Sequence, residues 1–324
     1  MKKIVVVGGG VLGSQIAFQT AYSGFEVVIW LRAECSIGHT QPKLDELKEK
    51  YKSAICKMAE DSGKSYDNWC RGIADYDEFD KDKCLEKVEE AWKNIRIELD
   101  LKKAVEGAYL VIESMSENME AKIEFYKRLA KVMDEETILV TNSSTLLPSK
   151  LAKYTGRPDR FLALHFANSI WKNNTAEVMA HNKTNMDNFE KVMNFAKDIH
   201  MVALPVKKEK SGYLLNSMLI PFLFSGLDLY VNGISDPVSI DMAWTLGTGA
   251  PEGPFQILDA VGINTAYNIV NMYVKIPSFI APYNFKGMAS LLKRYIDEGK
   301  LGKASGEGFY KYDKEGKIIT NIKE

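Results

Sequence analysis

The sequence predicts an α/β protein with a Rossmann-like, doubly wound sheet over residues 1–206 and a smaller all-helical domain over residues 207–324. Three observations predict this fold class. Residues 3–32 have the pattern of a strand, a glycine turn, a helix and a second strand. Strands and helices then alternate with short connections, and residues 210–298 show only helical spacing, interrupted by Gly and Pro.

The first element is a strand that runs directly into glycines. Residues 3–7 form a β-branched run, typical of a central parallel strand, and Gly8, Gly10 and Gly13 follow it. In this G-x-G-x-x-G pattern the first glycine permits a tight turn, the second lets a pyrophosphate approach the backbone, and the third lets the helix pack closely. A bare loop could contain three glycines. Between a strand and a helix, however, they predict a dinucleotide site at a helix N-terminus.

The second strand ends without the acid that would bind the ribose hydroxyls of NAD about 20 residues after the glycines. Leu31 stands there, Arg32 follows, and Ser36, His39 and Thr40 come shortly after. A cation with hydroxyl donors suits a ribose 2′-phosphate better than a bare diol. We therefore expect NAD(P)(H) as cofactor, with NADP(H) favoured. The alternative is that Arg32 is a solvated charge that stacks on adenine in either cofactor.

A helical excursion over residues 42–93 interrupts the alternation. Apolar residues fall at helical spacing in two stretches, Leu44, Leu47, Tyr51, Ile55 and Met58, and then Leu85, Val88 and Trp92. We expect two projecting helices joined by a looser segment over residues 62–76.

Regular alternation then resumes and is followed by helices alone. Strands are expected over residues 27–31, 95–97, 109–113, 137–141, 161–166, 176–179 and 202–206, with helices over 119–133 and 186–199 and a short helix at Pro148. Helices are expected over residues 213–232, 238–246, 255–261, 265–272 and 288–298. In a doubly wound sheet, ligands bind at the carboxyl ends of the parallel strands.

Composition excludes several classes of function. The chain has 324 residues, 46% of them hydrophobic, and its 42 basic and 43 acidic residues leave no global field for nucleic acid or an anionic membrane. No apolar stretch approaches the roughly 20 residues that span a bilayer. The four cysteines are widely spaced, without metal-ligand spacing. We expect a cytoplasmic protein with reduced thiols and no metal.

Polar residues follow three of the predicted strands, at residues 113–117, 142–144 and 165–168. Because parallel strands end at one edge of the sheet, these segments should converge where ligands bind. The alternative for Asn142, Ser143 and Ser144 is an N-cap before the Pro148 helix, since caps favour these residue types.

His165 is the candidate acid–base group. A lone histidine in a strand is more often a satisfied core residue, but Glu177 opens a later strand, and a buried carboxylate needs a partner. An imidazole held by a carboxylate is oriented and has its tautomer fixed. Asn216, in an otherwise apolar helix, either bonds a neighbouring helix or contacts substrate.

Several separated strings together resemble the 3-hydroxyacyl-CoA dehydrogenase family, most closely its diketoreductase branch. The resemblance covers nearly the whole chain apart from residues 42–93. Its strings, in order, are GVLGSQIAFQTA, TNSSTLLPS, FLALHFAN, NNTAEVM, GYLLNS, GTGAPEGPF and GKASGEGFYKY.

The resemblance implies roles for particular residues. His165 would be the general acid or base at the 3-hydroxyl, Glu177 would orient and charge it, and Ser144 and Asn216 would bind the substrate oxygen. The expected cofactor-binding residues are Gly8, Gly10, Val11, Leu12, Gly13, Arg32, Glu117, Lys122, Asn142 and Asn168. The family also implies a homodimer formed by the helical domain, and hydride transfer at the third carbon of the substrate.

One departure from the family leaves the substrate open. Acyl-CoA enzymes of the family usually carry a proline-rich apolar turn after the histidine, whereas this chain has HFANSIWKNNTAEV. Trp171 and two asparagines predict a tighter, more polar pocket. Lys57 and Lys64 are either CoA contacts or solvated helix charges. We expect a short-chain 3-hydroxyacyl-CoA dehydrogenase. The alternatives are a reductase of free β-keto or β-diketo compounds, and a non-catalytic dinucleotide-binding relative.

Overall fold

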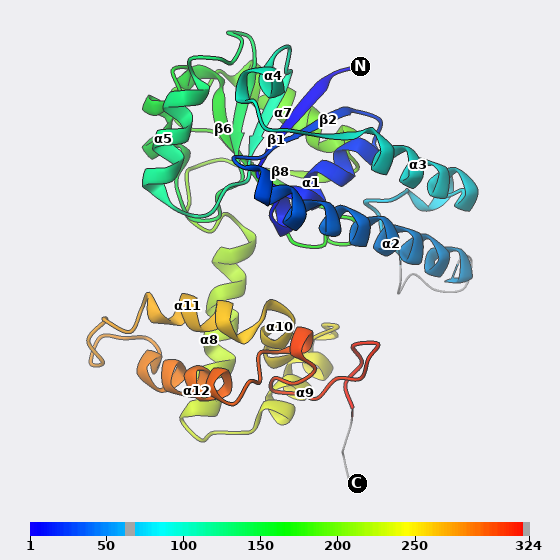
Figure 1. The fold of residues 1–324 in the computed structure, drawn as a ribbon. Helices are drawn as coiled ribbons and strands as arrows, with labels where there is room; N and C mark the ends of the chain where they lie inside the picture. Colours follow the sequence, from blue (N-terminus) through cyan, green and yellow to red (C-terminus); the bar gives the residue numbers. More distant parts are fainter. Residues whose placement is uncertain (62–68, 320–324) are drawn as a thin grey trace. The chain divides into compact units, whose positions relative to one another are not determined.

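The computed structural model describes residues 1–61 and 69–319. Contacts divide the chain into two compact units, Met1–Leu214 and Leu215–Glu324 (Figure 1). The first unit thus includes residues 207–214, which the sequence assigns to the second domain. The assignment of substrate binding and dimerisation to the second domain stays a prediction.

The first unit contains one eight-stranded sheet with the strand order β3-β2-β1-β4-β5-β6-β7-β8. The strands are β1 (Lys3–Val7), β2 (Glu26–Trp30), β3 (Ile95–Glu98), β4 (Leu110–Glu113), β5 (Ile138–Thr141), β6 (Phe161–Phe166), β7 (Thr175–Met179) and β8 (Val202–Val206). Every strand expected from the sequence is present. The order reverses direction at β1, between β2 and β4, which is where a doubly wound sheet binds its ligand.

The sheet is mixed rather than wholly parallel. The pairs from β3 to β6 are parallel, but β7 runs antiparallel to β6, and β8 is parallel to β7. The connection from β6 to β7 spans only residues 167–174, too short for the crossover that a parallel pair needs. The alternating pattern therefore predicted the doubly wound core correctly, but it did not indicate this reversal, which places His165 directly opposite Glu177.

Two layers of helices cover the sheet. Along β1, Ile4 and Val6 point into one core and Val5 and Val7 into the other, as the two-residue period of a strand requires. The first core includes α1 (Val11–Tyr22), α2 (Ile37–Asp61), α3 (Lys81–Asn94) and α7 (Met186–Asp198). The second includes α4 (Leu101–Val105), α5 (Met119–Leu129) and α6 (Pro148–Leu151), of which α4 was not expected.

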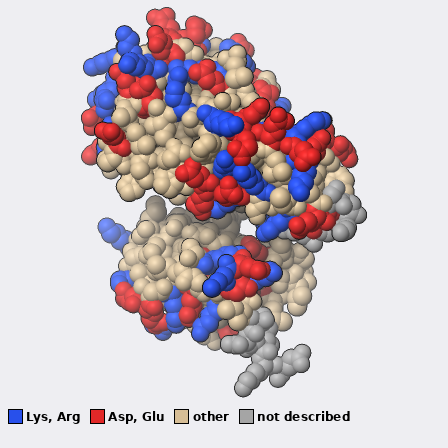
Figure 2. Space-filling view, turned by 45° about the vertical axis from the view of Figure 1, so that its right-hand side comes forward, with Lys and Arg blue, Asp and Glu red and all other residues tan. Residues whose placement is uncertain are grey.

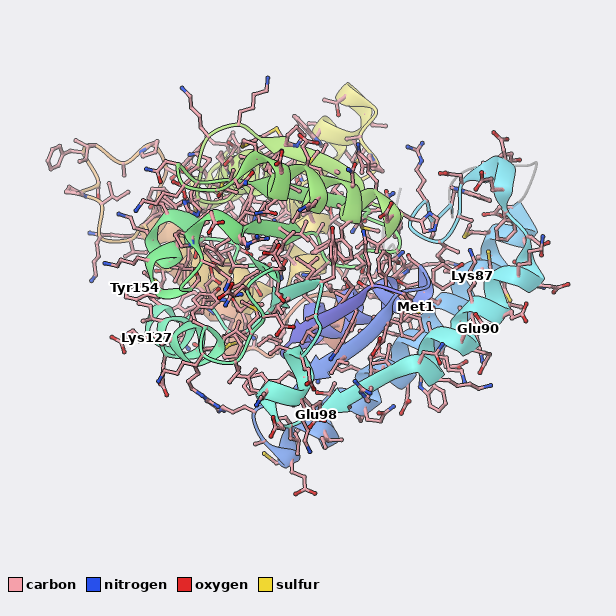
Figure 3. All side chains as sticks on the ribbon, turned by 90° about the horizontal axis from the view of Figure 1, so that it is seen from above. Met1, Lys87, Glu90, Glu98, Lys127 and Tyr154 are labelled. Carbon is pink, nitrogen blue, oxygen red and sulfur yellow. The ribbon has the colours of Figure 1, made fainter. Side chains whose placement is uncertain are left out.

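The predicted two-helix excursion is confirmed as α2 and α3, which lie side by side in Figure 1. The apolar residues that predicted α2 are all buried. Lys48 and Lys52 of α2 both reach Glu89 of α3, at 2.8 and 2.7 Å. Lys87 and Glu90 of α3 are exposed (Figure 3). Part of the expected connecting segment, including Lys64, lies outside the described residues.

The second unit contains the helices α8 (Leu215–Val231), α9 (Pro237–Thr248), α10 (Pro254–Val261), α11 (Ile263–Asn271) and α12 (Phe285–Asp297). Two buried carboxylates connect segments of this unit that are distant in the sequence. Asp241 accepts the N–H groups of Phe255 and Gln256 at the start of α10, and Asp259 accepts those of Phe309 and Tyr310. Burial raises the pKa of both carboxyl groups, although these hydrogen bonds oppose the shift.

The surface carries both signs of charge. On the face drawn in Figure 2, Lys and Arg side chains are interspersed with Asp and Glu. In the part of the chain that the structure describes, no helix combines the length and apolarity needed to cross a membrane.

Candidate functional site

The glycine turn between β1 and α1 has the geometry that its sequence predicts. Gly8 has φ +103°, and a Cβ there would lie 2.9 Å from the carbonyl oxygen of Ser114. A Cβ on Gly13 would lie 2.1 Å from the carbonyl oxygen of Gly8, so α1 packs closely only because residue 13 is glycine. A Cβ on Gly10 would instead point into open space. That space, beside the unpaired N–H groups that begin any helix, fits a dinucleotide phosphate.

The loop after β2 presents Arg32 but not every hydroxyl expected beside it. Leu31 is buried and Arg32 is exposed. Thr40 is also buried, and its hydroxyl donates to the carbonyl oxygens of Ser36 (2.9 Å) and Gly9 (3.3 Å). The expectation that the Thr40 hydroxyl meets a 2′-phosphate is therefore wrong, because this hydroxyl instead holds α2 against the glycine turn.

The end of β4 is fixed by a buried carboxylate. Glu113 is fully buried, and its Oε1 accepts from Lys122 Nζ and from the N–H of Met115 (2.7 Å). Its Oε2 accepts from the hydroxyls of Tyr126 (2.6 Å) and Thr141 (2.8 Å). Lys122 is equally buried, and its hydrogen bond to Glu113 supports the loop after β4. Direct contact between Lys122 and the cofactor stays a prediction.

Glu117 joins the loops after β4 and β5. Its Oε1 accepts from the Ser143 hydroxyl (2.5 Å), the Thr145 hydroxyl (2.6 Å) and the Thr145 N–H (2.8 Å). Burial alone would raise the pKa of Glu117, but the hydrogen bonds from Ser143 and Thr145 outweigh it, and the pKa is lowered. The ionised carboxylate thus fixes the loop that carries Ser144. Ser143 makes the local turn, since its hydroxyl accepts the N–H of Leu146.

Asn142 ties neighbouring strands together at the same edge. Its Oδ1 accepts the N–H of Phe166 in β6 (3.1 Å), and its Nδ2 lies 3.4 Å from the Ser114 hydroxyl. The short helix α6 has Leu147, not a serine, as its N-cap, and no side chain caps it. The cap interpretation of residues 142–144 is therefore not what the structure shows.

Ser144, His165 and Glu177, hereafter the trio, form one chain of hydrogen bonds. His165 Nε2 lies 3.1 Å from the Ser144 hydroxyl, and His165 Nδ1 lies 2.9 Å from Glu177 Oε2. His165 and Glu177 are 5% and 3% exposed, so the pair is shielded from water. An ionised carboxylate only accepts hydrogen bonds, so Nδ1 donates to it and Nε2 is left to exchange a proton. The trio is an oriented acid–base group at the ligand-binding edge of the sheet.

Comparison with known proteins agrees with this geometry. Residues 3–210 match the model of the 3-hydroxyacyl-CoA dehydrogenase NAD binding domain, and residues 212–312 match that of the C-terminal domain. The chain belongs to the 3-hydroxyacyl-CoA dehydrogenase family. It is accordingly a NAD-binding dehydrogenase, and the predicted family and fold class are confirmed.

Similar proteins match nearly the whole length of the chain. The mitochondrial hydroxyacyl-coenzyme A dehydrogenase of Homo sapiens is 33% identical over 96% of this chain and 91% of that enzyme. The probable 3-hydroxybutyryl-CoA dehydrogenase of Bacillus subtilis is 29% identical over 97% and 99%. A solved structure of a diketoreductase, described as a catalyst of dicarbonyl compounds, is 43% identical with a TM-score of 0.80, covering 96% and 99% of the two chains.

Asn168 of the first unit lies outside the hydrogen-bonded trio, and Asn216 belongs to the second unit. Asn168 is exposed, and its carbonyl oxygen accepts from Asn173 Nδ2 (2.8 Å). Asn216 is half-buried in the first turn of α8, in the second unit. Their contacts with cofactor and substrate stay predictions.

Trp171 packs against α2, and its expected part in the substrate pocket stays a prediction. Its ring lies 5.4 Å from that of Tyr51, centroid to centroid, and packs on the core beneath α2. Its carbonyl oxygen accepts the N–H of Gly72 (3.1 Å). Trp171 thus anchors the helical excursion to the sheet.

Sequence reasoning placed Glu113 at the ligand-binding edge, within residues 113–117, but gave it no role, and it did not identify Tyr213. Glu113 ends an apolar strand, and the only signal was a charged residue at a position that the strand pattern buries. Tyr213 packs on the imidazole of His165 but lies far from it in sequence. No local spacing links Tyr213 to the trio, so only the fold could reveal the contact.

Proposed function

We propose that this protein transfers a hydride between a nicotinamide cofactor and the third carbon of a short-chain 3-hydroxyacyl or 3-ketoacyl substrate. The observation that carries the proposal is the hydrogen-bonded trio, with His165 and Glu177 buried, at the edge of the sheet that also holds the glycine turn. Proton transfer at an alcohol or ketone oxygen needs one such oriented group beside the hydride acceptor.

The residues of the chain then have distinct roles. During oxidation His165 Nε2 takes the proton of the 3-hydroxyl, and Glu177 stabilises the resulting imidazolium. Ser144, together with Asn216, donates hydrogen bonds to the oxygen on which charge develops. During reduction the protonated imidazole returns the proton to the ketone. The nicotinamide ring, when bound, supplies the hydride chemistry at C4.

The substrate assay separates three functions. Purified protein is supplied with NADH or NADPH and either acetoacetyl-CoA or a free β-diketo ester, and cofactor oxidation is followed by absorbance. A kcat/KM at least about tenfold higher with acetoacetyl-CoA supports a CoA-dependent enzyme, as the human and Bacillus subtilis relatives are named. The reverse preference supports a diketoreductase-like enzyme, in line with the similar solved structure. Cofactor binding without turnover of either compound contradicts the proposed function and supports a non-catalytic relative.

Arg32 is the residue that we expect to favour NADP(H). Its exposed guanidinium follows a strand that ends without an acid, and an arginine–phosphate contact contributes about 1.5–3 kcal/mol. Arg32→Ala should weaken NADPH binding about tenfold and NADH binding by no more than about twofold, measured as Kd by fluorescence titration. Arg128→Ala, which removes an exposed arginine of α5, is the matched control. Equal losses for both cofactors would contradict the NADP(H) preference and leave Arg32 as an adenine contact.

We also expect a homodimer formed through the helical unit. Met242, Trp244 and Leu246 of α9 are 49%, 41% and 78% exposed, which is a costly arrangement for an apolar surface in water. Leu246→Glu should convert the dimer to a monomer in sedimentation velocity, with the helical circular dichroism of the protein retained. Met186→Glu, at an exposed methionine of α7, should leave the dimer intact. If the unchanged chain sediments as a monomer, the dimer prediction is wrong.

A cytoplasmic location remains part of the proposal. All four cysteines carry free thiols in the structure, which suits a reducing compartment. Fractionation of the source cells would test it directly.

A further inference from the structure

Tyr213 packs flat against the imidazole that the proposed function uses. The two ring centroids are 4.5 Å apart and the ring planes differ by only 11°. Tyr213 is 1% exposed, and its hydroxyl donates to the carbonyl oxygen of Ser143 (2.8 Å). The ring is thus held by its own hydrogen bond to the loop that carries Ser144, and it forms a wall behind His165.

The residues on either side of Tyr213 contact the other two members of the trio. The N–H of Gly212 donates to the carbonyl oxygen of Ser144 (3.1 Å), and the N–H of Leu214 donates to Glu177 Oε1 (2.8 Å). Three consecutive residues therefore hold the backbone of Ser144, the imidazole of His165 and the carboxylate of Glu177 in turn.

The backbone of this segment is in an unfavourable conformation. Tyr213 has φ +51° and follows Gly212 at φ +81°, so two successive residues occupy the left-handed region. For a bulky residue this conformation costs roughly 1–2 kcal/mol, and such strain persists only where surrounding contacts enforce it. Here the left-handed turn aims the aromatic ring at His165 while the next N–H faces Glu177.

The stack supplies a restraint that the hydrogen bonds of the trio lack. The bonds at Nδ1 and Nε2 lie in the plane of the imidazole, so they resist motion within that plane and permit tilting out of it. A flat aromatic ring in contact with one face blocks that tilt. It also presents its negative face to the ring that becomes cationic during proton transfer.

We propose that Tyr213 is a positioning residue for the reaction, which acts through His165 by keeping Nε2 aimed at the substrate oxygen. This inference rests on the proposed function and deepens it. In this proposal the aromatic ring of Tyr213, rather than its hydroxyl, is essential for positioning His165. A leucine at position 213 should therefore impair the chemical step, whereas a phenylalanine should preserve it.

The test compares Tyr213→Leu with Tyr213→Phe. Tyr213→Leu should lower kcat about 10- to 100-fold, as small misplacements of reacting groups do, with KM changed by no more than about threefold. Tyr213→Phe should stay within about threefold of the unchanged protein, because it loses one neutral hydrogen bond and keeps the stack. Tyr51→Leu is the control, since Tyr51 is also fully buried and hydrogen-bonded but belongs to α2 and donates its hydroxyl to Gln19. It should lower the melting temperature without a selective loss of kcat.

A spectroscopic readout tests the same proposal without turnover. The chain has four histidines, so the imidazole C–H signals of histidine-labelled protein are few, and the signal missing in His165→Ala identifies that of His165. A stacked ring shields those protons, so the His165 signals should move downfield in Tyr213→Leu and stay in place in Tyr213→Phe. If the leucine variant is folded, retains the shielded signals and keeps its kcat, the proposal is overturned. If the unchanged protein shows the shielding but reduces no β-keto compound, the proposed function fails while the stacking contact stands.

Discussion

Replacing His165 with alanine should lower kcat by about 100- to 10,000-fold while the Kd for NADH or NADPH stays within about twofold of the unchanged protein. The reason is that His165 Nε2 is the proton-exchanging atom of the trio. The opposite ring nitrogen, Nδ1, lies 2.9 Å from the Glu177 carboxylate, which orients the ring. The glycine turn that fits the dinucleotide phosphate belongs to other elements, β1 and α1. Rapid-mixing measurement of cofactor oxidation, with cofactor affinity measured separately, checks both parts.

His181 provides a matched control for the loss of a buried imidazole. It is 6% exposed against 5% for His165, and its Nδ1 accepts the N–H of Lys183 (3.2 Å) in the turn after β7. His181→Ala should lower the melting temperature and leave kcat within about threefold of the unchanged value. Full turnover by a folded His165→Ala protein would show that another group moves the proton, and the assignment of the trio would then be wrong.

Replacing Glu177 with glutamine should reduce kcat by about 100-fold or more, with cofactor affinity again preserved. Glutamine has the size of glutamate but no charge, so it cannot stabilise the imidazolium that forms during oxidation. Its amide nitrogen can also donate to Nδ1, which would reverse the tautomer of His165. Steady-state kinetics in both directions, with circular dichroism and a melting curve, measure the effect on a folded protein.

Glu177→Asp separates the effect of the carboxylate charge from the effect of side-chain length. Aspartate keeps the charge but is shorter by one methylene, so it should recover part of the activity that Glu177→Gln loses. The N–H of Leu214 bonds to Glu177 Oε1, and both substitutions should therefore also lower the melting temperature somewhat. Equal and small losses of kcat in the two variants would mean that Glu177 serves only the packing of β7 against β6.

The parts of the fold that could be predicted depend on neighbouring residues in the sequence. The β-branched run of β1, the glycines after it and the apolar spacing along α2 each report a local preference, and the structure confirms all three. Strand ends could also be predicted, because polar residues follow the apolar runs of buried strands, and parallel strands end at one edge of the sheet. For this reason Asn142, Ser144 and His165 were expected at one edge of the sheet, where the structure places them.

The features that could not be predicted depend on which segments pack against each other in the folded chain. Thr40 looked available to a phosphate because its spacing from Arg32 was suitable, yet its hydroxyl is used to hold α2. Trp171 was expected to line the substrate pocket, and only the fold reveals that its ring also packs against Tyr51 of the excursion. Burial of a particular side chain is decided by the element packed above it, and sequence spacing does not identify that element.

The sequence by itself determined the dinucleotide turn and the two kinds of domain, because these follow from local propensity and period. It also offered His165 and Glu177 as candidates for proton transfer, through their chemistry and the family resemblance. Tertiary structure alone decided that β7 runs antiparallel to β6 and so sets His165 against Glu177. It also decided that Gly212, Tyr213 and Leu214 contact the trio. These contacts join segments distant in the chain, and they form only when the sheet has assembled and its edge has excluded water.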